Sequence, residues 1–208
     1  MKNHAQQLGI RPQETLLDRS YHHAAMKAIE GAPKRGRPDI VHFALMEALS
    51  TPLYIDGYLS VYVHTAANKV IKIETDNLRV PKSYFRFEGL MIDLFRKKIV
   101  ETADGSVLMR LDEMTFGKLL DSIGGKMVVG LSTSGIRSTV HEIASRFVGK
   151  DLDCVFVVGG FPREHFSENM TSRFNFTYSI SDIGLEAHVV IARILYECEN
   201  ALGIYDQK

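Results

Sequence analysis

The sequence is poor in the features that mark membrane, disulfide-bonded and metal-binding proteins. Its 208 residues include two cysteines, Cys154 and Cys198, and no tryptophan. Two cysteines make neither a disulfide framework nor a metal cage. No apolar run approaches the roughly 20 residues that span a bilayer, and Met1–His4 does not open a signal peptide. We therefore expect a cytoplasmic protein with buried, inert thiols, no metal and no membrane partner.

The signatures of several large enzyme classes are also absent. No Gly-x-Gly-x-x-Gly follows an apolar run, and no Gly-x-x-x-x-Gly-Lys-Ser/Thr occurs, which disfavours dinucleotide and P-loop sites. Ser132 and Ser134 lack evident His and Asp partners for nucleophilic chemistry. His22 and His23 are adjacent and point to different helix faces, so they are not a ligand pair. We interpret His42 as an interior histidine.

The charge is balanced overall but uneven along the chain. Lys and Arg total 25, as do Asp and Glu. Residues 1–98 contain 15 basic and 10 acidic side chains, and residues 99–208 contain 10 basic and 15 acidic ones. The basic side chains cluster at 34–37 and again over 79–98. Scattered surface charge explains this pattern by itself, but a local basic face is also what binds phosphates.

The second half of the chain has the pattern of an α/β domain. Three apolar runs, Lys126–Leu131, Cys154–Val158 and Phe176–Ser179, alternate with helical segments over 139–147 and 185–202. Continuous apolar strands that alternate with helices are typical of a buried, largely parallel sheet. The composition, 45% hydrophobic and 24% charged, is that of a globular domain.

The first half predicts a mixture of helices and a hairpin within the same single domain. Helices are expected over 20–29, 40–50, 84–98 and 116–123, with Asp39 as N-cap of the second. Strands over 58–64 and 69–74 should form a hairpin, and 107–114 should be extended. We interpret residues 51–125 as an elaboration of one domain that spans residues 1–208.

Each of the three apolar runs ends in a loop rich in Gly or Ser, at 131–135, 159–162 and 180–184. In open α/β sheets, ligands bind beyond the carboxyl ends of the strands. Glycines there let the backbone approach a ligand closely. The same glycines are equally consistent with plain strand-end turns, so the loops alone leave both interpretations open.

Four sequence blocks are distinctive: Gly36–His42 (GRPDIVH), Leu78–Met91 (LRVPKSYFRFEGLM), Val157–Pro162 (VVGGFP) and Tyr178–Leu185 (YSISDIGL). They resemble the pseudouridine-N1-specific methyltransferase family of small-subunit ribosome biogenesis, in the SPOUT superfamily. The blocks occur in the family's order, and the resemblance covers about residues 20–205.

The resemblance implies a SPOUT-type α/β fold in which residues 126–205 form a trefoil knot that binds S-adenosylmethionine. True knots are rare, and no periodicity predicts one. The residues that the resemblance assigns to the cofactor are Leu131 and Thr133 in the first loop, Gly159, Gly160 and Glu164 in the second, and Ser179, Ile180, Ser181, Asp182, Ile183, Gly184 and Leu185 in the third.

The resemblance also implies a homodimer and small-subunit rRNA as the partner. It assigns RNA contact to Arg37, Arg79, Lys82 and Arg86; the family often has arginine where this chain has Lys82. Asp39 is the natural partner to orient Arg37 and the candidate catalytic base. The expected activity is methylation of pseudouridine N1. Two alternatives stay open: an rRNA-binding assembly factor without catalysis, and a related methyltransferase that acts on another RNA base.

The resemblance is incomplete at the N-terminus. Family chains usually begin with an additional strand, whereas Leu8–Leu17 is a poor strand candidate. The cofactor loops are unaffected by this difference.

Overall fold

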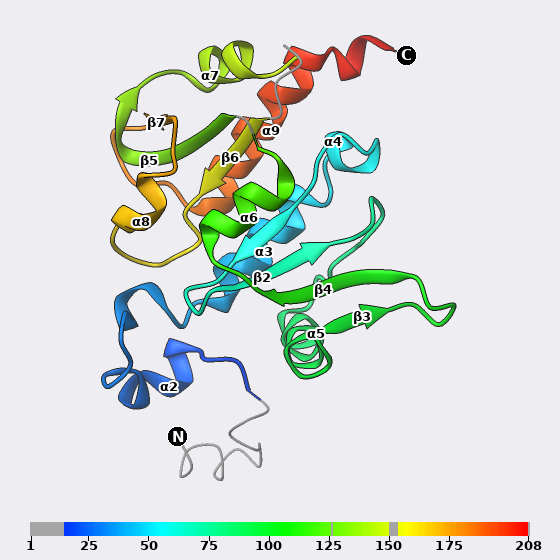
Figure 1. The fold of residues 1–208 in the computed structure, drawn as a ribbon, viewed down its shortest axis with the longest axis vertical. Coiled ribbons are helices and arrows are strands. Elements are labelled where there is room, and N and C mark those ends of the chain that lie inside the picture. Colours follow the sequence, from blue (N-terminus) through cyan, green and yellow to red (C-terminus); the bar gives the residue numbers. More distant parts are fainter. Residues whose placement is uncertain (1–14, 126, 150–153, 208) are drawn as a thin grey trace.

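The computed structural model describes residues 15–125, 127–149 and 154–207, which form helices around two sheets (Figure 1). One sheet is three-stranded, in the order β6-β5-β7, and the other is four-stranded, in the order β1-β2-β4-β3. The predicted mixed α/β class with a parallel sheet is confirmed. Residues 8–14 of the doubtful strand Leu8–Leu17 lie outside the described residues, and the trefoil knot and the domain boundaries stay predictions.

The parallel sheet consists of β5 (Met127–Arg137), β6 (Cys154–Val158) and β7 (Phe176–Ser179). β5 lies in the centre, where Val129 pairs with Phe156 on one side and with Phe176 on the other. Val129 is completely buried. All three strands are where the apolar runs predicted them, because a strand covered on both faces has no polar alternation.

β5 is longer than predicted. The apolar run ends at Leu131, but the strand continues to Arg137. Both Leu131 and Ile136 pair with Tyr178, so the register of the pairing with β7 shifts between them. The polar stretch 132–135 therefore lies within the strand, and the prediction of a strand-end loop at 131–135 was wrong. Gly135 crosses β7 so closely that a Cβ there would lie 2.6 Å from the Thr177 carbonyl, which explains why a residue without a side chain is needed.

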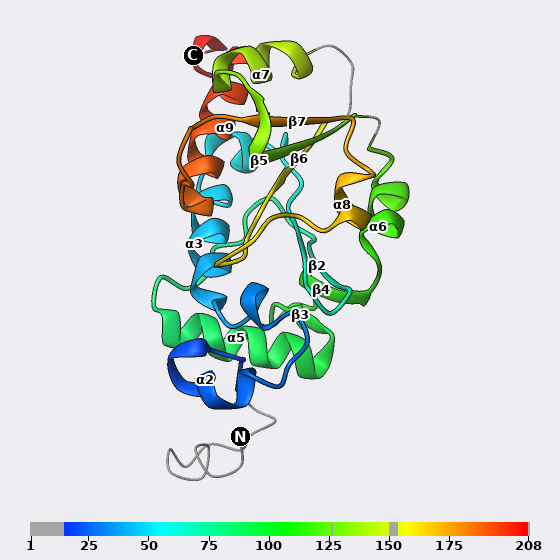
Figure 2. The same cartoon turned by 90° about the vertical axis from the view of Figure 1, so that its left-hand side faces the viewer.

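Two layers of helices cover the parallel strands. α3 (Pro38–Ala48) and α9 (Ala187–Leu202) lie side by side on one face, and α6 (Phe116–Ile123) and α8 (Glu168–Thr171) lie on the other (Figure 2). α7 (Val140–Phe147) packs against α9 and begins with a capping box formed by Thr139 and Glu142. The core between these elements contains Ile143, Phe147 and Ile194.

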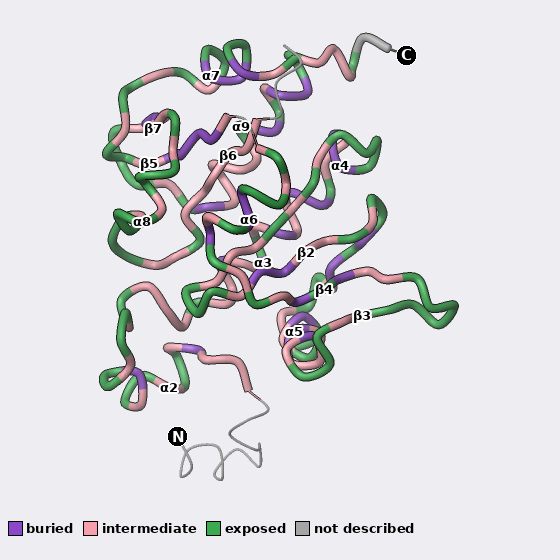
Figure 3. Tube along the Cα trace, in the orientation of Figure 1, coloured by how far each residue is buried: buried purple, intermediate pink, exposed green. Residues whose placement is uncertain are grey.

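The second sheet is antiparallel and contains the predicted hairpin. β1 (Tyr62–His64) and β2 (Lys69–Ile73) pair around a turn in which Asn68 has a φ of 52°. β4 (Val107–Glu113) pairs with β2 and with β3 (Ile99–Glu101), a strand the sequence analysis did not predict. α5 (Tyr84–Lys97) packs on this sheet (Figure 3). Its Phe87 and Leu94 belong to the same buried cluster as Met109 of β4.

Three helix ends differ from the sequence-based expectation. Asp39 is not the N-cap of α3; Arg37 is the N-cap and Pro38 is the first helical residue, because the fixed φ of proline suits that position. α2 (Arg19–Met26) ends three residues before the predicted end at residue 29. A short helix that was not predicted, α4 (Pro52–Ile55), follows α3, with Thr51 as its N-cap. Single 3-10 turns occupy Ala32–Lys34 (η2) and Ile204–Gln207 (η3).

The cysteines have the environment of structural thiols. Cys198 is buried and Cys154 is half-buried, and burial raises the pKa of each thiol to about 12. Within residues 15–125, 127–149 and 154–207, no helix is long and apolar enough to cross a bilayer. The same residues include no group of three His, Cys, Asp or Glu side chains placed to hold a metal ion.

The crossing at Gly135 gives a stability prediction. Gly135→Ala should lower the free energy of unfolding by about 1–3 kcal/mol, because the added methyl group forces backbone apart. Gly89→Ala is the matched control: its Cβ would meet no atom within 4 Å, so it should raise helix stability by about 0.4–1 kcal/mol. Urea unfolding of both variants measures the difference, and equal stabilities would contradict the close crossing.

Candidate functional site

The ends of β6 and β7 lie abreast of Leu131, the position in β5 after which its pairing register shifts. Leu131 of β5 pairs with Val158 of β6 and with Tyr178 of β7. The residues that follow these three positions are the Gly- and Ser-rich stretches that the sequence analysis singled out. The fold therefore brings all three predicted loops together, although they are separated by up to about 50 residues of sequence.

The stretch after β7 is held by its own hydrogen bonds. The Ser179 hydroxyl donates to the Ser181 carbonyl at 2.8 Å, and the Ser181 hydroxyl accepts from the Ile183 amide at 3.3 Å. An ion pair of 3.6 Å between Arg137 and Asp182 joins this stretch to the end of β5. These contacts fix the backbone while Gly184 stays exposed.

The stretch after β6 combines a crowded and an open glycine. A Cβ on Gly159 would lie 2.8 Å from the Phe161 ring, whereas one on Gly160 would meet nothing within 4 Å. Glu164 has a φ of 72°, a conformation that costs an ordinary residue about 1 kcal/mol or more. Its carboxylate pairs with Lys34 at 3.7 Å, which ties this stretch to η2.

The predicted cofactor residues divide into a buried base and an exposed rim. Leu131 and Ser179 are buried. Gly159, Ile180, Ser181 and Leu185 are half-buried, and Thr133, Gly160, Glu164, Asp182, Ile183 and Gly184 are exposed. Together they combine apolar side chains with bare backbone, the usual composition of a small-molecule site.

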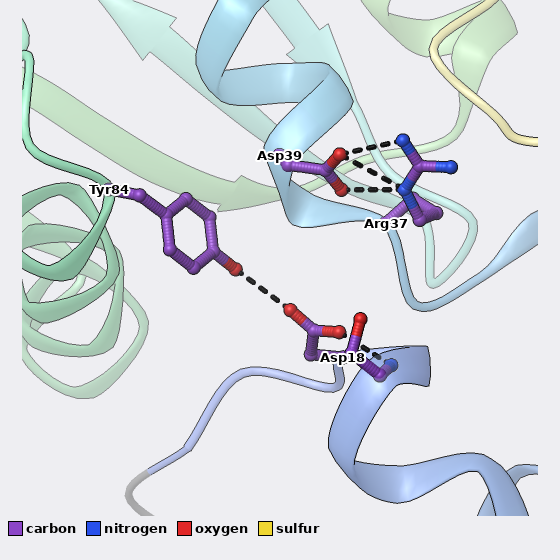
Figure 4. A network of polar contacts seen from close by, with 5 residues as sticks. Asp18, Arg37, Asp39 and Tyr84 are labelled. Atoms are coloured by element: carbon purple, nitrogen blue, oxygen red, sulfur yellow. Dashed lines mark hydrogen bonds and ion pairs between the residues drawn. The ribbon is translucent and has the colours of Figure 1, made fainter.

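Arg37 and Asp39 form a paired fork at the start of α3 (Figure 4). Arg37 Nε donates to both Asp39 carboxylate oxygens, at 2.8 Å and 3.0 Å, and Nη2 donates to Oδ2 at 2.7 Å. The hydrogen bonds from Arg37 hold the pKa of Asp39 below its ordinary value, with burial opposing them. Asp39 was expected to orient Arg37 and to be the candidate catalytic base. The hydrogen bonds place Asp39 where it orients the Arg37 guanidinium. A carboxylate with a lowered pKa is a weak base at neutral pH.

Asp18 and Tyr84 form a second polar contact beside this fork, which the sequence analysis missed. The Tyr84 hydroxyl donates to Asp18 Oδ2 at 3.2 Å, and Asp18 Oδ1 accepts from the Ser20 amide at 2.8 Å (Figure 4). Burial and the Asp18 charge raise the pKa of Tyr84. Tyr84 belongs to the block Leu78–Met91, but no pattern in the sequence near Asp18 indicated the contact.

His42 connects the fork to the basic segment that follows residue 78. Its Nε2 donates to the Pro81 carbonyl at 2.7 Å, and its ring stacks on Phe87 with centroids 4.3 Å apart. The histidine is buried, as predicted. Because Pro81 lies between Arg79 and Lys82, this bond positions the segment against the helix that begins with Arg37 and Asp39.

Arg79, Lys82 and Arg86 are all exposed. Within the described part of the chain, none of the three takes part in an ion pair, whereas Arg96 and Lys97 at the other end of α5 both pair with Asp93. Unpaired cations keep their full charge available for an anionic ligand. With Arg37, they form what we call the basic surface: Arg37, Arg79, Lys82 and Arg86.

A separate cleft of about 2070 Å³ lies between the two sheets. Its walls include β6, the hairpin strand β1 and helix α6, and its rim includes Gly160 and Arg37. The residues after β7 do not line it. This volume far exceeds the roughly 300–1,000 Å³ of an ordinary ligand pocket, so we do not equate the cleft with the site at the strand ends.

Comparison with known proteins decides the family. The model of the EMG1/NEP1 methyltransferase family matches residues 2–199. The chain belongs to this family. It is 35% identical over 198 residues to a ribosomal RNA small subunit methyltransferase Nep1 of Thermococcus onnurineus, covering 95% of this chain and 87% of the relative. It is 36% identical over 189 residues to that of Methanothrix thermoacetophila, covering 91% and 81%.

A solved EMG1/NEP1 structure has the same fold. The crystal structure of Archaeoglobus fulgidus Nep1 bound to S-adenosylhomocysteine superposes with a TM-score of 0.81 at 32% identity, over 97% of this chain and 88% of that chain. The predicted family and SPOUT-type α/β fold are confirmed. The roles of individual residues of this EMG1/NEP1 chain stay predictions.

The fork gives a pH-dependent prediction. In Arg37→Gln, the pKa of Asp39 should rise to or above its ordinary 3.8, because the charged donor is gone and burial remains. A carboxyl group whose pKa is lower in the folded state than in the unfolded state stabilises the folded protein at pH values above the unfolded-state pKa. This stabilisation disappears as the pH falls through the folded-state pKa. The unchanged protein should therefore lose this increment as the pH falls below 3.8, and the variant should lack it. Carboxyl NMR titration of Asp39 measures the pKa; the same value in both proteins would contradict the pairing.

Proposed function

We propose that this protein transfers a methyl group from S-adenosylmethionine to N1 of a pseudouridine in small-subunit rRNA. The observation that carries the proposal is the presence of two features in one EMG1/NEP1 family member. One is the edge at which three Gly- and Ser-bearing stretches meet. The other is the basic surface, whose segment after residue 78 is held against α3 by the bond from His42 to Pro81.

The strand-end residues suit the methyl donor. Gly160 and Gly184 expose backbone beside which a Cβ would meet no atom within 4 Å, which leaves peptide N–H and C=O groups free to bind an adenine or an amino-acid moiety. Leu131 is buried at the base and supplies an apolar floor. The crystal structure of the Archaeoglobus fulgidus relative contains S-adenosylhomocysteine, the demethylated donor.

The basic surface would hold the acceptor. S-adenosylmethionine supplies an electrophilic methyl group on a sulfonium leaving group. The N1 position of pseudouridine carries a proton. In the transfer this proton would pass to solvent water, negative charge would develop on the ring, and N1 would bond to the methyl carbon as the bond from that carbon to sulfur breaks. Arg37 is placed to stabilise this charge or a neighbouring phosphate, because Asp39 fixes its guanidinium in one plane. We assign Asp39 an orienting role ahead of that of a base, because its pKa is lowered.

Arg79, Lys82 and Arg86 are proposed to contact RNA phosphates. An unpaired, exposed arginine gains two charge-assisted hydrogen bonds to one phosphate, while Lys82 provides a point charge without the fork. These contacts would offset the few kcal/mol needed to hold a base out of its stack, which favours a loop as the substrate.

A homodimer is part of the proposal. Ile136 and Ile183 are each 70% exposed beside the strand-end edge. Two large apolar side chains left in water at one edge are consistent with coverage by a second copy. The cytoplasmic location stays a prediction from the sequence.

The alternative function is an rRNA-binding assembly factor that does not methylate. This alternative stays a candidate because the basic surface and the strand-end edge consist of different residues. Binding of RNA requires only the basic surface. Incubation with labelled S-adenosylmethionine and two matched rRNA hairpins, with pseudouridine or uridine in the loop, distinguishes the functions. Label in the pseudouridine hairpin alone is the expected result. Equal label in both would move the target to another atom, and tight binding without label would favour the assembly factor.

Arginine substitutions test the assignment of the basic surface. Arg37→Ala and Arg86→Ala should each weaken hairpin binding by roughly 10- to 150-fold and leave S-adenosylmethionine binding unchanged, since a charge-assisted contact contributes about 1.5–3 kcal/mol. Arg96→Ala is the matched control, because Arg96 lies on the same helix as Arg86 but already pairs with Asp93. Calorimetry measures the affinity of each variant for the hairpin and for S-adenosylmethionine. A loss of both affinities would contradict the prediction that the two ligands bind through different residues.

A further inference from the structure

Phe85 is the most exposed large hydrophobic side chain in the described part of the chain, at 81%. It lies in the first turn of α5, two residues before Phe87, which is buried in the core. Because successive helical residues are rotated by about 100°, Phe85 lies almost opposite the buried face. The folding of α5 therefore does not require a phenyl ring at this position.

Single exposed apolar side chains are common, so exposure alone indicates nothing. Two neighbours distinguish Phe85. Lys82 lies three residues before it, and Arg86 follows it; both are exposed, and neither forms an ion pair within the described residues. A helical side chain leans toward the N-terminus of its helix, which brings the ring toward Lys82.

A third distinguishing neighbour is Gly89, one helical turn after Phe85. Residues four apart lie next to each other on a helix surface. A Cβ on Gly89 would meet no atom within 4 Å, so the surface beside Phe85 is open rather than filled by another element. An aromatic ring with an open flank, between two unpaired cations, has the composition of a single-stranded nucleic-acid platform.

We propose that Phe85 is a stacking platform for an unpaired base of the RNA. The assignment rests on the proposed function and adds a residue to its RNA site. Lys82 and Arg86 contact the phosphates on either side of the stacked nucleotide, and Gly89 leaves room for the base. Since the bases of a duplex are already stacked on each other, this contact selects loops over stems.

The charge of the surroundings favours RNA over a second copy of this chain as the occupant. In a two-fold contact the same patch meets itself. Lys82 and Arg86 of two copies would then face each other without the anions that either needs, and like charges across an interface are unfavourable. A polyanion carries the complementary charge.

The absence of tryptophan from the sequence provides a direct probe. In Phe85→Trp the new indole is the only one, so its fluorescence reports this position alone. Titration with a hairpin that has pseudouridine in its loop should quench it. Tyr58→Trp is the control: Tyr58 is 63% exposed but lies outside residues 82–89, which form the proposed stacking site, and its fluorescence should not change.

Affinity measurements separate stacking from charge. Phe85→Ala should raise the Kd for the hairpin about 5- to 150-fold, which corresponds to a stacking contribution of about 1–3 kcal/mol. It should leave the slope of log Kd against log salt unchanged. Arg86→Ala should reduce that slope by about 0.7, because one phosphate contact is lost. A blunt RNA duplex without a loop should bind the unchanged protein and Phe85→Ala equally.

A steric variant tests the open flank without altering Phe85. Gly89→Leu places a side chain beside the ring in a position where Phe and Leu pack together on a helix. It should weaken binding of the hairpin but not of the duplex, and Gly89→Ala, which adds only a methyl group, should weaken binding of the hairpin less than Gly89→Leu does. Thermal unfolding confirms that both variants fold.

Each contrary result has a definite meaning. If Phe85→Ala binds the hairpin normally while Arg86→Ala does not, the stacking role is wrong and the proposed function stands. If the unchanged protein binds no RNA, both are wrong. If Phe85→Ala leaves RNA affinity intact but converts a dimer into monomers, the ring belongs to a protein interface, and the stacking role is also wrong.

Discussion

The pairing of β5 with parallel strands on both sides is the constraint on which the site depends. Strands that run in the same direction end at the same edge, so the stretches after Leu131, Val158 and Tyr178 meet without any contact designed for that purpose. Complete burial of Val129 shows that the middle of β5 is enclosed by its neighbouring strands and by the helices on both faces. The cofactor edge is in this sense a consequence of sheet topology.

The basic surface depends on a different and more local interaction. α3 packs beside α9, which leads away from the strand-end edge, and His42 of α3 holds the Pro81 carbonyl. One buried imidazole thus links the helix that carries Arg37 to the segment that carries Arg79, Lys82 and Arg86. Asp18 and Tyr84 brace the same junction from the N-terminal side. The two halves of the proposed reaction are held by different elements, which lets donor and RNA bind through separate contacts.

The sequence predicted the parallel strands, the hairpin and α5 because continuous apolar runs and helical periodicity report burial directly. It failed where tertiary contact decides the outcome. β5 continues past Leu131, and Gly135 in this part of the strand lies against the backbone of β7. Arg37 rather than Asp39 is the N-cap of α3, and the Asp39 carboxylate accepts hydrogen bonds from the Arg37 guanidinium. β3 is too short for its alternation to be recognised. For the site, the ends of the apolar runs predicted the positions of the loops, and the family resemblance supplied the proposed roles of the residues. The Asp18–Tyr84 contact joins residues 66 positions apart, and no local sequence pattern predicted it.

The most direct test of this account is an amide NMR titration of the isotopically labelled protein, first with S-adenosylhomocysteine and then with the pseudouridine hairpin. The account predicts that the first ligand shifts the amides of residues 131–135, 159–164 and 179–185 and leaves 79–86 unchanged. The hairpin should then shift residues 79–86 and the amide of Arg37. Shifts confined to residues 79–86 on addition of S-adenosylhomocysteine, with the strand-end amides unmoved, would contradict the placement of the donor at the carboxyl ends of the parallel strands.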